Sequence, residues 1–236
     1  MKIAVINFSG NVGKSTVARH LLLPRIEGAE LIAVESINAD GSQGQALRGR
    51  QFGELQEYLH TVDSVIVDIG ASNVEDLLGL MHRYRGSHED FDYFVVPTVP
   101  PLKQQQDTIA TLIELAELGV PTSRIKLVFN MVDEDADVPQ AFRQLLAFIA
   151  HRPVARVDVA CKLGKNEIYA RLKDSGYDLS VLAQDVTDYK ALIVKASGVA
   201  DKLALAQRLA TRRLACGVVP ELDACFAALA LDLQPA

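Results

Sequence analysis

The residues with the clearest chemical signature lie close to the N-terminus, in the segment Ser9-Gly10-Asn11-Val12-Gly13-Lys14-Ser15-Thr16. An apolar run, KIAVINF, precedes the segment, and a helical pattern begins at its lysine. In such loops backbone N–H groups bind phosphate oxygens, the lysine binds the β- and γ-phosphates, and the hydroxyl after the lysine binds magnesium. The order of strand, glycine-containing loop and helix therefore predicts a site for a nucleoside triphosphate with Mg²⁺.

Two further observations define this predicted site. The common G-x-x-x-x-G-K-[ST] spacing would place a glycine at position 8, where this chain has Phe8, but the loop amides and Lys14 are retained. A second buried run, SVIVDIG, ends in Asp68, and a carboxylate at the end of such a strand holds Mg²⁺ through water in phosphoryl-transfer sites. We therefore expect Ser15 and Asp68 to form the magnesium site.

The segment NFSGNVGKST resembles the variant Walker A loop of the ParA/MinD superfamily of P-loop ATPases. The positions that follow the family pattern are Gly10, Gly13, Lys14, Ser15 and Thr16. Ser9 replaces the signature lysine of the family, and Asn11 replaces its second glycine. In the family that lysine reaches the phosphates of a partner in a nucleotide-sandwich dimer. The resemblance thus implies ATP binding, while Ser9 puts the dimer geometry and its hydrolysis in doubt.

The same resemblance assigns further residues. The family orients the attacking water with an acidic residue after its second strand, for which Glu35 and Asp40 are the candidates, Glu35 being favoured by its place at the strand end. Together with Lys14 and Asp68 they form the expected catalytic set. Asn130, in FNMVDED, corresponds to an asparagine that contacts adenine; guanine is the weaker inference, because Met131 stands where the N-K-x-D motif has lysine.

Within the superfamily the chain is similar to plasmid StbB-type stability proteins. The segment CKLGKNEIYARLKDSG also resembles this group. This resemblance implies a role in plasmid maintenance or conjugative DNA transfer, with a DNA-binding adaptor protein as partner. The wider superfamily resemblance suggests a nucleotide-dependent homodimer, which the replacement at Ser9 puts in doubt. Direct contact with DNA is the less favoured interpretation.

The elements that would position these residues alternate between strand and helix. Short runs rich in Val and Ile predict strands that are buried on both faces, and strands separated by helices predict a parallel sheet. The expected strands are KIAVINF, ELIAVES, SVIVDIG, YFVVPTV, IKLVFNMV and a weaker VARVDVA. The expected helices cover residues 14–23, 52–60, 73–84, 104–118 and 140–150. The sequence thus predicts a doubly wound α/β fold, with a mostly parallel sheet flanked by helices.

From residue 166 onward the pattern is helical, so we expect one domain over residues 1–236, with a core of about 1–160 and a helical extension of about 161–236. The long segment 187–215 is interrupted near Gly198, and Pro220 marks the start of a new helix. Basic residues in this region predict a solvated face more strongly than a DNA-binding one. Lys162 or Lys165 are candidates to replace the missing signature lysine. The final helix, LDACFAALALDL, is expected to pack on the domain or on a second subunit.

Composition limits the class of protein. The 236 residues carry a formal charge of −6, and the three cysteines lack C-x-x-C spacing, which favours reduced thiols over a zinc or redox site. No apolar run reaches the roughly 18 residues that a membrane span requires, and the N-terminus reads as a strand and not as a signal peptide. We expect a soluble cytoplasmic protein.

Three functions remain open at this point. The first is a ParA-like ATPase, expected to be weak, whose ATP-bound state recruits partners. The second is a nucleotide-binding scaffold with negligible hydrolysis, which the replacement at Ser9 supports. The third, and least favoured, is a small-molecule ligase similar to dethiobiotin synthetase, or a kinase, which would need an acceptor pocket.

Overall fold

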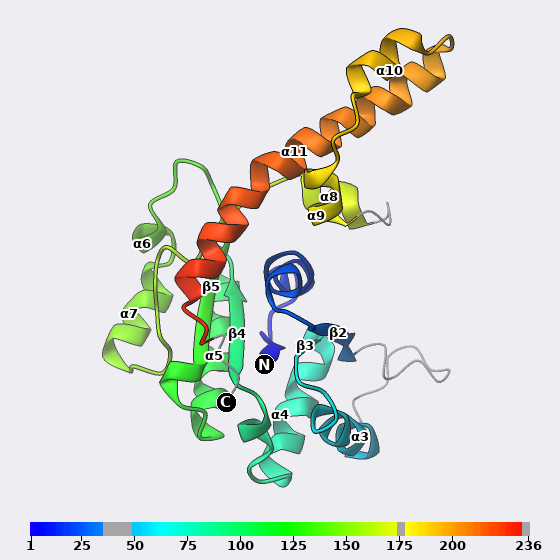
Figure 1. The fold of residues 1–236 in the computed structure, drawn as a ribbon. Helices are drawn as coiled ribbons and strands as arrows, with labels where there is room; N and C mark the ends of the chain where they lie inside the picture. Colours follow the sequence, from blue (N-terminus) through cyan, green and yellow to red (C-terminus); the bar gives the residue numbers. More distant parts are fainter. Residues whose placement is uncertain (35–48, 174–177, 233–236) are drawn as a thin grey trace. The chain divides into compact units, whose positions relative to one another are not determined.

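The computed structural model describes residues 1–34, 49–173 and 178–232 (Figure 1). Two compact units make up the chain. The first comprises Met1–Lys165 together with Cys225–Ala236, and the second comprises Asn166–Ala224. The first unit ends close to the expected start of the helical extension, but the last turn of the final helix also belongs to it.

A six-stranded parallel sheet forms the centre of the first unit, in the order β2-β3-β1-β4-β5-β6. The strands are β1 (Lys2–Val5), β2 (Glu30–Ala33), β3 (Val65–Asp68), β4 (Tyr93–Thr98), β5 (Ile125–Val132) and β6 (Lys162–Gly164). From β1 the chain passes to β2 at the edge of the sheet, returns to β3 between β2 and β1, and then crosses to β4 on the other side of β1. In parallel sheets with such a switch, ligands bind beyond the carboxyl ends of the central strands.

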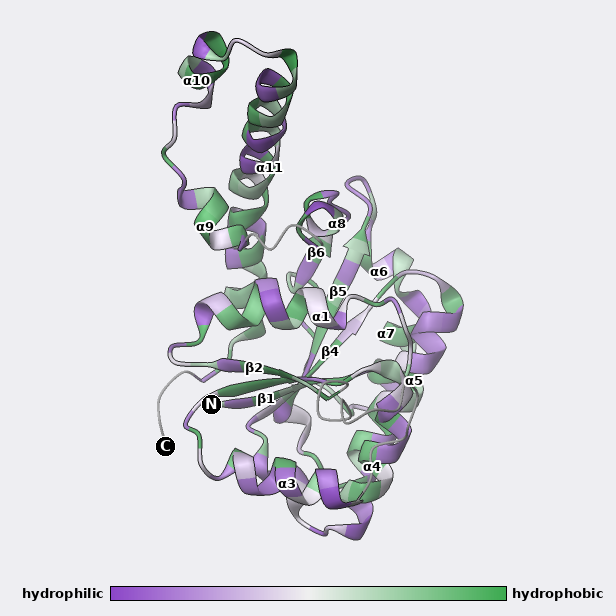
Figure 2. Cartoon of the chain, turned by 90° about the vertical axis from the view of Figure 1, so that its right-hand side faces the viewer, coloured by the Kyte–Doolittle hydropathy of each residue, from purple (hydrophilic) through white to green (hydrophobic). Residues whose placement is uncertain are grey.

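Helices cover both faces of this sheet. In Figure 2 the helix that follows β1 lies on one side, and α3 and α4 lie on the other. The helices of the first unit are α1 (Lys14–Thr16), η1 (Val17–Leu22), η2 (Leu23–Arg25), α3 (Gly49–Leu59), η3 (Ala71–Asn73), α4 (Val74–Arg83), η4 (Ser87–Asp90), α5 (Leu102–Glu117), η5 (Thr122–Arg124), α6 (Val138–Ala141) and α7 (Arg143–His151). The predicted doubly wound α/β fold is confirmed.

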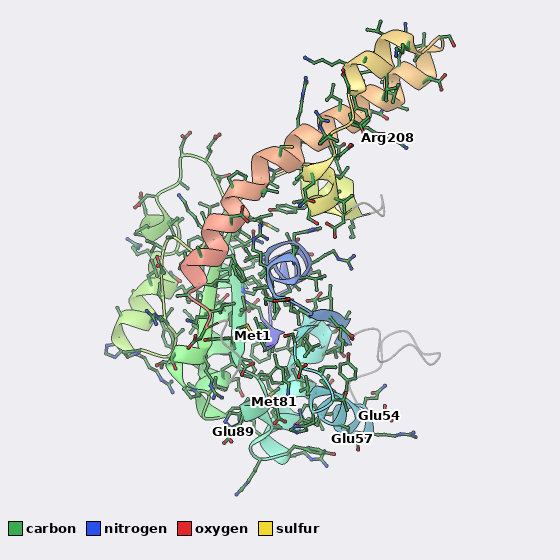
Figure 3. All side chains as sticks on the ribbon, viewed as in Figure 1. Met1, Glu54, Glu57, Met81, Glu89 and Arg208 are labelled. Atoms are coloured by element: carbon green, nitrogen blue, oxygen red, sulfur yellow. The ribbon has the colours of Figure 1, made fainter. Side chains whose placement is uncertain are left out.

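Alternation along the strands explains the two-sided core. Successive side chains of a strand point to opposite faces, and in β1 both Ile3 and Ala4 are fully buried. Ala4 belongs to the hydrophobic cluster that includes Phe52 of α3. Helix α3 is amphipathic, because Glu54 and Glu57 are exposed and project from its outer side (Figure 3).

The sixth strand lies further along the chain than the sequence predicted. In the segment VARVDVA only Arg156 forms a bridge, to Lys126 of β5. Asp158 ends the segment in a turn, because its side chain accepts a hydrogen bond from the Ala160 amide at 2.8 Å and its carbonyl accepts one from Cys161 at 3.0 Å. The turn returns the chain to β5, where residues 162–164 pair instead.

The second unit is helical, as expected. It contains α8 (Ile168–Lys173), α9 (Leu179–Gln184), α10 (Tyr189–Lys195) and most of α11 (Val199–Leu229). The expected break near Gly198 separates α10 from α11, but the expectation that Pro220 begins a new helix is wrong, since α11 continues through it. Proline lacks the N–H that an interior position needs. Val218 and Leu222 are buried on either side of Pro220, and burial of apolar side chains offsets that loss.

The end of α11 packs within the first unit. Cys225 and Leu229 are buried, and Lys126 of β5 donates a hydrogen bond to the carbonyl of Ala230 at 3.2 Å. The end of α11, red in Figure 1, lies beside β5. Of the two expected packing partners, this agrees with packing on the domain. Within the part of the chain described, no helix is long and apolar enough to cross a membrane.

Candidate nucleotide-binding site

The loop between β1 and α1 has the backbone shape of a phosphate-binding loop. Asn11 and Gly13 have left-handed conformations, with φ of 58° and 85°, and α1 begins at Lys14, with the Val17 amide bonded to the Gly13 carbonyl at 2.9 Å. The first amides of a helix have no partner within it, and the helix dipole adds positive potential there. This loop end is therefore suited to bind an anion.

Lys14 is folded over the loop. Only 7% of its surface is exposed, and its ammonium donates to the carbonyls of Asn7 at 3.0 Å and Ser9 at 2.7 Å. A lysine at this depth must have its charge compensated, and here loop carbonyls contribute to that. The ammonium is thereby held next to the loop backbone. The sequence pattern predicts that this loop binds the phosphates.

Ser9 is also buried, with 4% of its surface exposed. Its amide donates to the side-chain oxygen of Asn7 at 2.8 Å, and its carbonyl accepts from Lys14. Ser9 is thus part of the wall of the loop. A short hydroxyl side chain in this position cannot span the distance to another subunit that a lysine can.

Asn130 supports the loop from β5. Its side-chain amide donates to the carbonyl of Val12 at 2.9 Å, and its side-chain oxygen accepts from the Met131 amide at 2.9 Å. Gly13 lies so close that a Cβ added to it would stand 2.1 Å from the Asn130 Nδ2 atom. Gly13 is therefore required both by its φ and by this contact. The contact of Asn130 with a base stays a prediction; its bracing of the loop was not predicted.

A buried polar network, which the sequence did not reveal, joins the loop to β4 and α5. The Asn7 side-chain amide donates to the Pro97 carbonyl at 2.9 Å and to the Thr108 hydroxyl at 2.8 Å. The Thr108 hydroxyl also lies 3.0 Å from that of Thr98. Asn7, Thr98 and Thr108 are each fully buried, and satisfied buried networks of this kind hold a unique conformation. The loop is thus tied to the exit of β4 and to α5.

Asp68 lies at the same edge of the sheet as the loop. In the parallel register it stands opposite Val5, and the next amide, that of Ile69, donates to the Val5 carbonyl at 3.1 Å. Ser15, in the first turn after the loop, is exposed. A carboxylate and a hydroxyl are hard oxygen ligands of the type that Mg²⁺ prefers, and Mg²⁺ bound with phosphates needs few protein ligands. The donor set fits magnesium, and no cluster of three or more His, Cys, Asp or Glu occurs among the described residues.

The other predicted residues are placed as follows. Glu35 and Asp40 lie outside the described residues. Lys165 forms an ion pair with Asp133, with 2.6 Å between its Nζ atom and the Asp133 Oδ1 atom, and Lys162 is exposed on β6. The structure therefore gives Lys165 an acidic partner in the loop that follows β5. Both side chains of this pair are more than half exposed, so the pair contributes little to stability.

No family model matches this chain, and no curated protein matches it. Among solved structures, apo McdA of Cyanothece superposes with a TM-score of 0.50 and 16% identity, over 88% of this chain and 98% of that one. An ATP complex of a Cyanothece McdA variant gives 0.46 and 14%, over 94% and 96%. A protein of Borrelia burgdorferi B31 described as a plasmid partition protein, bound to AMPPNP, gives 0.46 and 14%, over 88% and 98%. At these identities the likeness to apo McdA establishes the fold, which agrees with the ParA/MinD resemblance of residues 7–16.

Proposed function

We propose that this chain is a ParA-like switch that binds Mg-ATP at residues 9–16. The observation that carries the proposal is the position of Lys14, a nearly buried cation held by loop carbonyls at the start of a helix. Phosphate oxygens are stronger acceptors for an ammonium than neutral carbonyls are. Lys14 would therefore exchange its loop partners for the β- and γ-phosphates, and the amides that open α1 would bind the same group.

Ser15 and Asp68 would complete the site by holding magnesium, Ser15 directly and Asp68 through water. The ion supplies positive charge that neutralises the β- and γ-phosphate oxygens. Asp68 is the last residue of β3, and Ser15 lies on α1, the helix that follows the neighbouring strand β1. The pairing of β1 with β3 thus places Asp68 beside the start of the loop that leads to Ser15, and support from regular elements is what such sites need.

The switch would work through the network of Asn7. Because Asn7 bonds to both Pro97 and Thr108, a change in the loop on binding phosphate changes the partners available to the exit of β4 and to α5. Order in segments that contact the γ-phosphate is a common basis of nucleotide switches. ATP would thus stabilise one surface for a partner, and loss of the γ-phosphate would release it.

A scaffold with negligible hydrolysis is the second candidate, and the burial of Ser9 favours it. With 4% of its surface exposed and a short side chain, Ser9 cannot supply charge to a second subunit. We expect turnover to be weak for this reason. The adaptor protein, the role in plasmid maintenance or conjugative transfer, the nucleotide-dependent homodimer and the cytoplasmic location belong to this proposal as predictions from the sequence.

Calorimetric titration with ATP, ADP and GTP in magnesium tests the proposal. Lys14→Ala should reduce ATP affinity at least about a hundredfold, since it removes a charge-assisted contact worth about 3 kcal/mol. Lys103→Ala is the matched control, because Lys103 is an exposed lysine paired with Asp107 on α5. Circular dichroism verifies that both variants fold.

Binding of ATP that Lys14→Ala abolishes and Lys103→Ala preserves would support the phosphate site. Phosphate release measured with and without DNA then separates the two candidates. Release above background favours the hydrolysing switch, and binding without release favours the scaffold. ATP affinity that is the same in Lys14→Ala and the unaltered chain would refute the site.

A further inference from the structure

Exposed apolar side chains are concentrated in the second unit. Of the ten large hydrophobic residues that are exposed in the described part of the chain, six lie between residues 166 and 224, and four of these fall at α10 and the start of α11. Those four are Leu192, Val194, Val199 and Leu203, with exposed fractions of 42%, 82%, 85% and 58%. Single exposed apolar residues are ordinary, but a group on adjoining helices indicates an interaction surface.

Basic side chains share this region. Residues 189–213, here called the basic hairpin, contain α10 and the first half of α11. Six basic residues and one acidic residue give the basic hairpin a net charge of +5, so the rest of the chain, whose total is −6, carries −11. The basic residues are Lys190, Lys195, Lys202, Arg208, Arg212 and Arg213. Figure 2 shows hydrophilic and hydrophobic residues mixed on these helices, and Figure 3 labels Arg208 on α11.

The base of the basic hairpin is held in place by a defined set of contacts. Arg212 donates to the carbonyls of Asp185 at 3.0 Å and Thr187 at 2.7 Å, and its guanidinium lies 5.5 Å from the centre of the Tyr189 ring. Asp188 caps α10 by accepting from the Ala191 amide at 3.0 Å. The Tyr189 hydroxyl donates to Asp185 at 2.6 Å. A surface built on such supports is largely pre-formed, which reduces the entropy lost on binding.

We propose that the basic hairpin is the docking surface for an acidic, amphipathic helix of a partner protein. An apolar stripe on that helix would cover Val194, Val199 and Leu203, and its carboxylates would face Lys195 and Lys202. Binding of an amphipathic helix through apolar anchors spaced three or four residues apart is a recurrent mode of recognition, and complementary charge around the anchors fixes its orientation.

Three other occupants fit the observations less well. Two basic hairpins would repel each other, since both carry +5. DNA phosphates would pair with the lysines but would leave the apolar group facing charge. An anionic bilayer would accept both, yet Trp, which anchors proteins at membrane interfaces, is absent from residues 189–213, and Tyr189, the one aromatic residue there, is buried. The adaptor of the proposed function would thus carry an acidic amphipathic helix. The observations for this helix are the exposure and charge of side chains in the second unit, and none comes from the nucleotide site.

A selection against the full chain tests the proposal. A library of helical peptides displayed on phage is selected on the unaltered protein. The selected peptides are then titrated with the unaltered protein and with two variants. The charge variant carries Lys195→Glu with Lys202→Glu, and the apolar variant carries Val194→Ser with Val199→Ser. The control carries Lys103→Glu with Val159→Ser, exposed residues of the first unit. Nucleotide is omitted, so failure of the triphosphate site cannot affect the result.

The selected peptides should be acidic, with apolar residues at intervals of three and four. Each of the two variants should weaken binding by about tenfold or more, which corresponds to about 1.4 kcal/mol, and the control should bind unchanged. Short duplex DNA and phosphatidylserine vesicles are titrated in parallel. Basic or unenriched peptides would overturn the proposal. So would DNA or vesicle binding that is stronger than peptide binding, or loss of peptide binding in the charge variant alone.

Discussion

Individual residues at the candidate site act through the loop backbone more than through their own chemistry. Gly13 provides a left-handed conformation and leaves room for Asn130, whose amide bonds to the Val12 carbonyl. Asn7 fixes the same loop from the other side by its bonds to Pro97 and Thr108. The loop is therefore held in shape by two asparagines, one just after β1 and one in β5, which is the pre-organisation that phosphate binding requires.

Gly13→Ala should damage this loop, and Gly10→Ala should not. A Cβ on Gly13 would be 2.1 Å from Asn130, at a φ of 85°, whereas nothing lies within 4 Å of a Cβ on Gly10. An L-residue in the left-handed region costs about 1–2 kcal/mol before any clash is counted. We expect Gly13→Ala to lower the urea midpoint and to abolish ATP binding in calorimetry. Equal effects of the two variants would contradict the contact.

The motifs in the sequence nominate candidate residues one segment at a time, among them Asp68 and Asn130, but they miss the contacts that join distant segments. Lys14 and Ser15 follow from the order of strand, loop and helix within one segment. The bond between Asn7 and Thr108 joins residues 101 positions apart, and the one between Asn130 and Val12 joins residues 118 apart. No local pattern encodes such pairs, because they exist only once the parallel sheet has brought its strand ends together.

At the scale of elements, the segment between α9 and α10 is built around one carboxylate. Asp185 accepts from the Thr187 hydroxyl, the Tyr189 hydroxyl and the Thr187 amide. These bonds, above all that from the Thr187 hydroxyl, lower the pKa of Asp185 to about 2 from its ordinary 3.8, with Arg212 adding to the effect against a small cost of desolvation. The charged form of Asp185 is thus the one that this segment uses.

Acid should loosen the segment in a defined window. Because the pKa of Asp185 is lowered on folding, its contribution is complete above pH 3.8 and is lost as the pH falls towards 2. The protection factors of the α10 amides, which are exchange rates corrected for the intrinsic rate at each pH, should fall over that range. Asp185→Asn should show fast exchange already at neutral pH and less further change with acid. Asp201→Asn, on the exposed start of α11, serves as the control and should behave like the unaltered chain.

The positions of the strands, though not all of their ends, were predicted where burial alone determines them. The strands β1, β3, β4 and β5 are apolar runs whose residues are almost all buried. Residues 154–160 have the same apolar share but form no strand, because Asp158 makes a turn with Ala160 and Cys161. Helix α11 continues through Pro220. The low helix propensity of this proline is outweighed by the packing of its neighbours.

At the scale of the whole molecule, β5 serves two distant regions of the chain. Asn130 near its carboxyl end braces the phosphate loop, and Lys126 near its start holds the end of α11. Lys126 also lies 5.2 Å from the centre of the Tyr93 ring, whose hydroxyl accepts from the Asp232 amide at 2.9 Å. Burial and the nearby Arg156 lower the pKa of Lys126. A cation next to the last carbonyls of a helix also stabilises that helix end.

Lys126→Met should release the C-terminal end without disturbing the phosphate loop. The change removes one buried hydrogen bond and the contact with the Tyr93 ring, for a loss of about 1 kcal/mol. Hydrogen exchange over residues 225–232 should accelerate, while ATP affinity stays unchanged. Tyr93→Phe, which removes only the bond to Asp232, should give a smaller acceleration. Weakened ATP binding in Lys126→Met would show instead that the two ends of β5 are coupled.

The contact between Gly13 and Asn130 also constrains how the sequence can diverge. With 2.1 Å between a Cβ at position 13 and the Asn130 amide nitrogen, any larger residue at 13 needs a smaller one at 130. A smaller residue at 130 in turn leaves the Val12 carbonyl without its donor. Because the φ of 85° also favours glycine at position 13, we expect Gly13 and Asn130 to be retained together. In a chain without a matching family model, such a pair offers a marker by which distant relatives with the same loop can be recognised, even after the surrounding motif has changed.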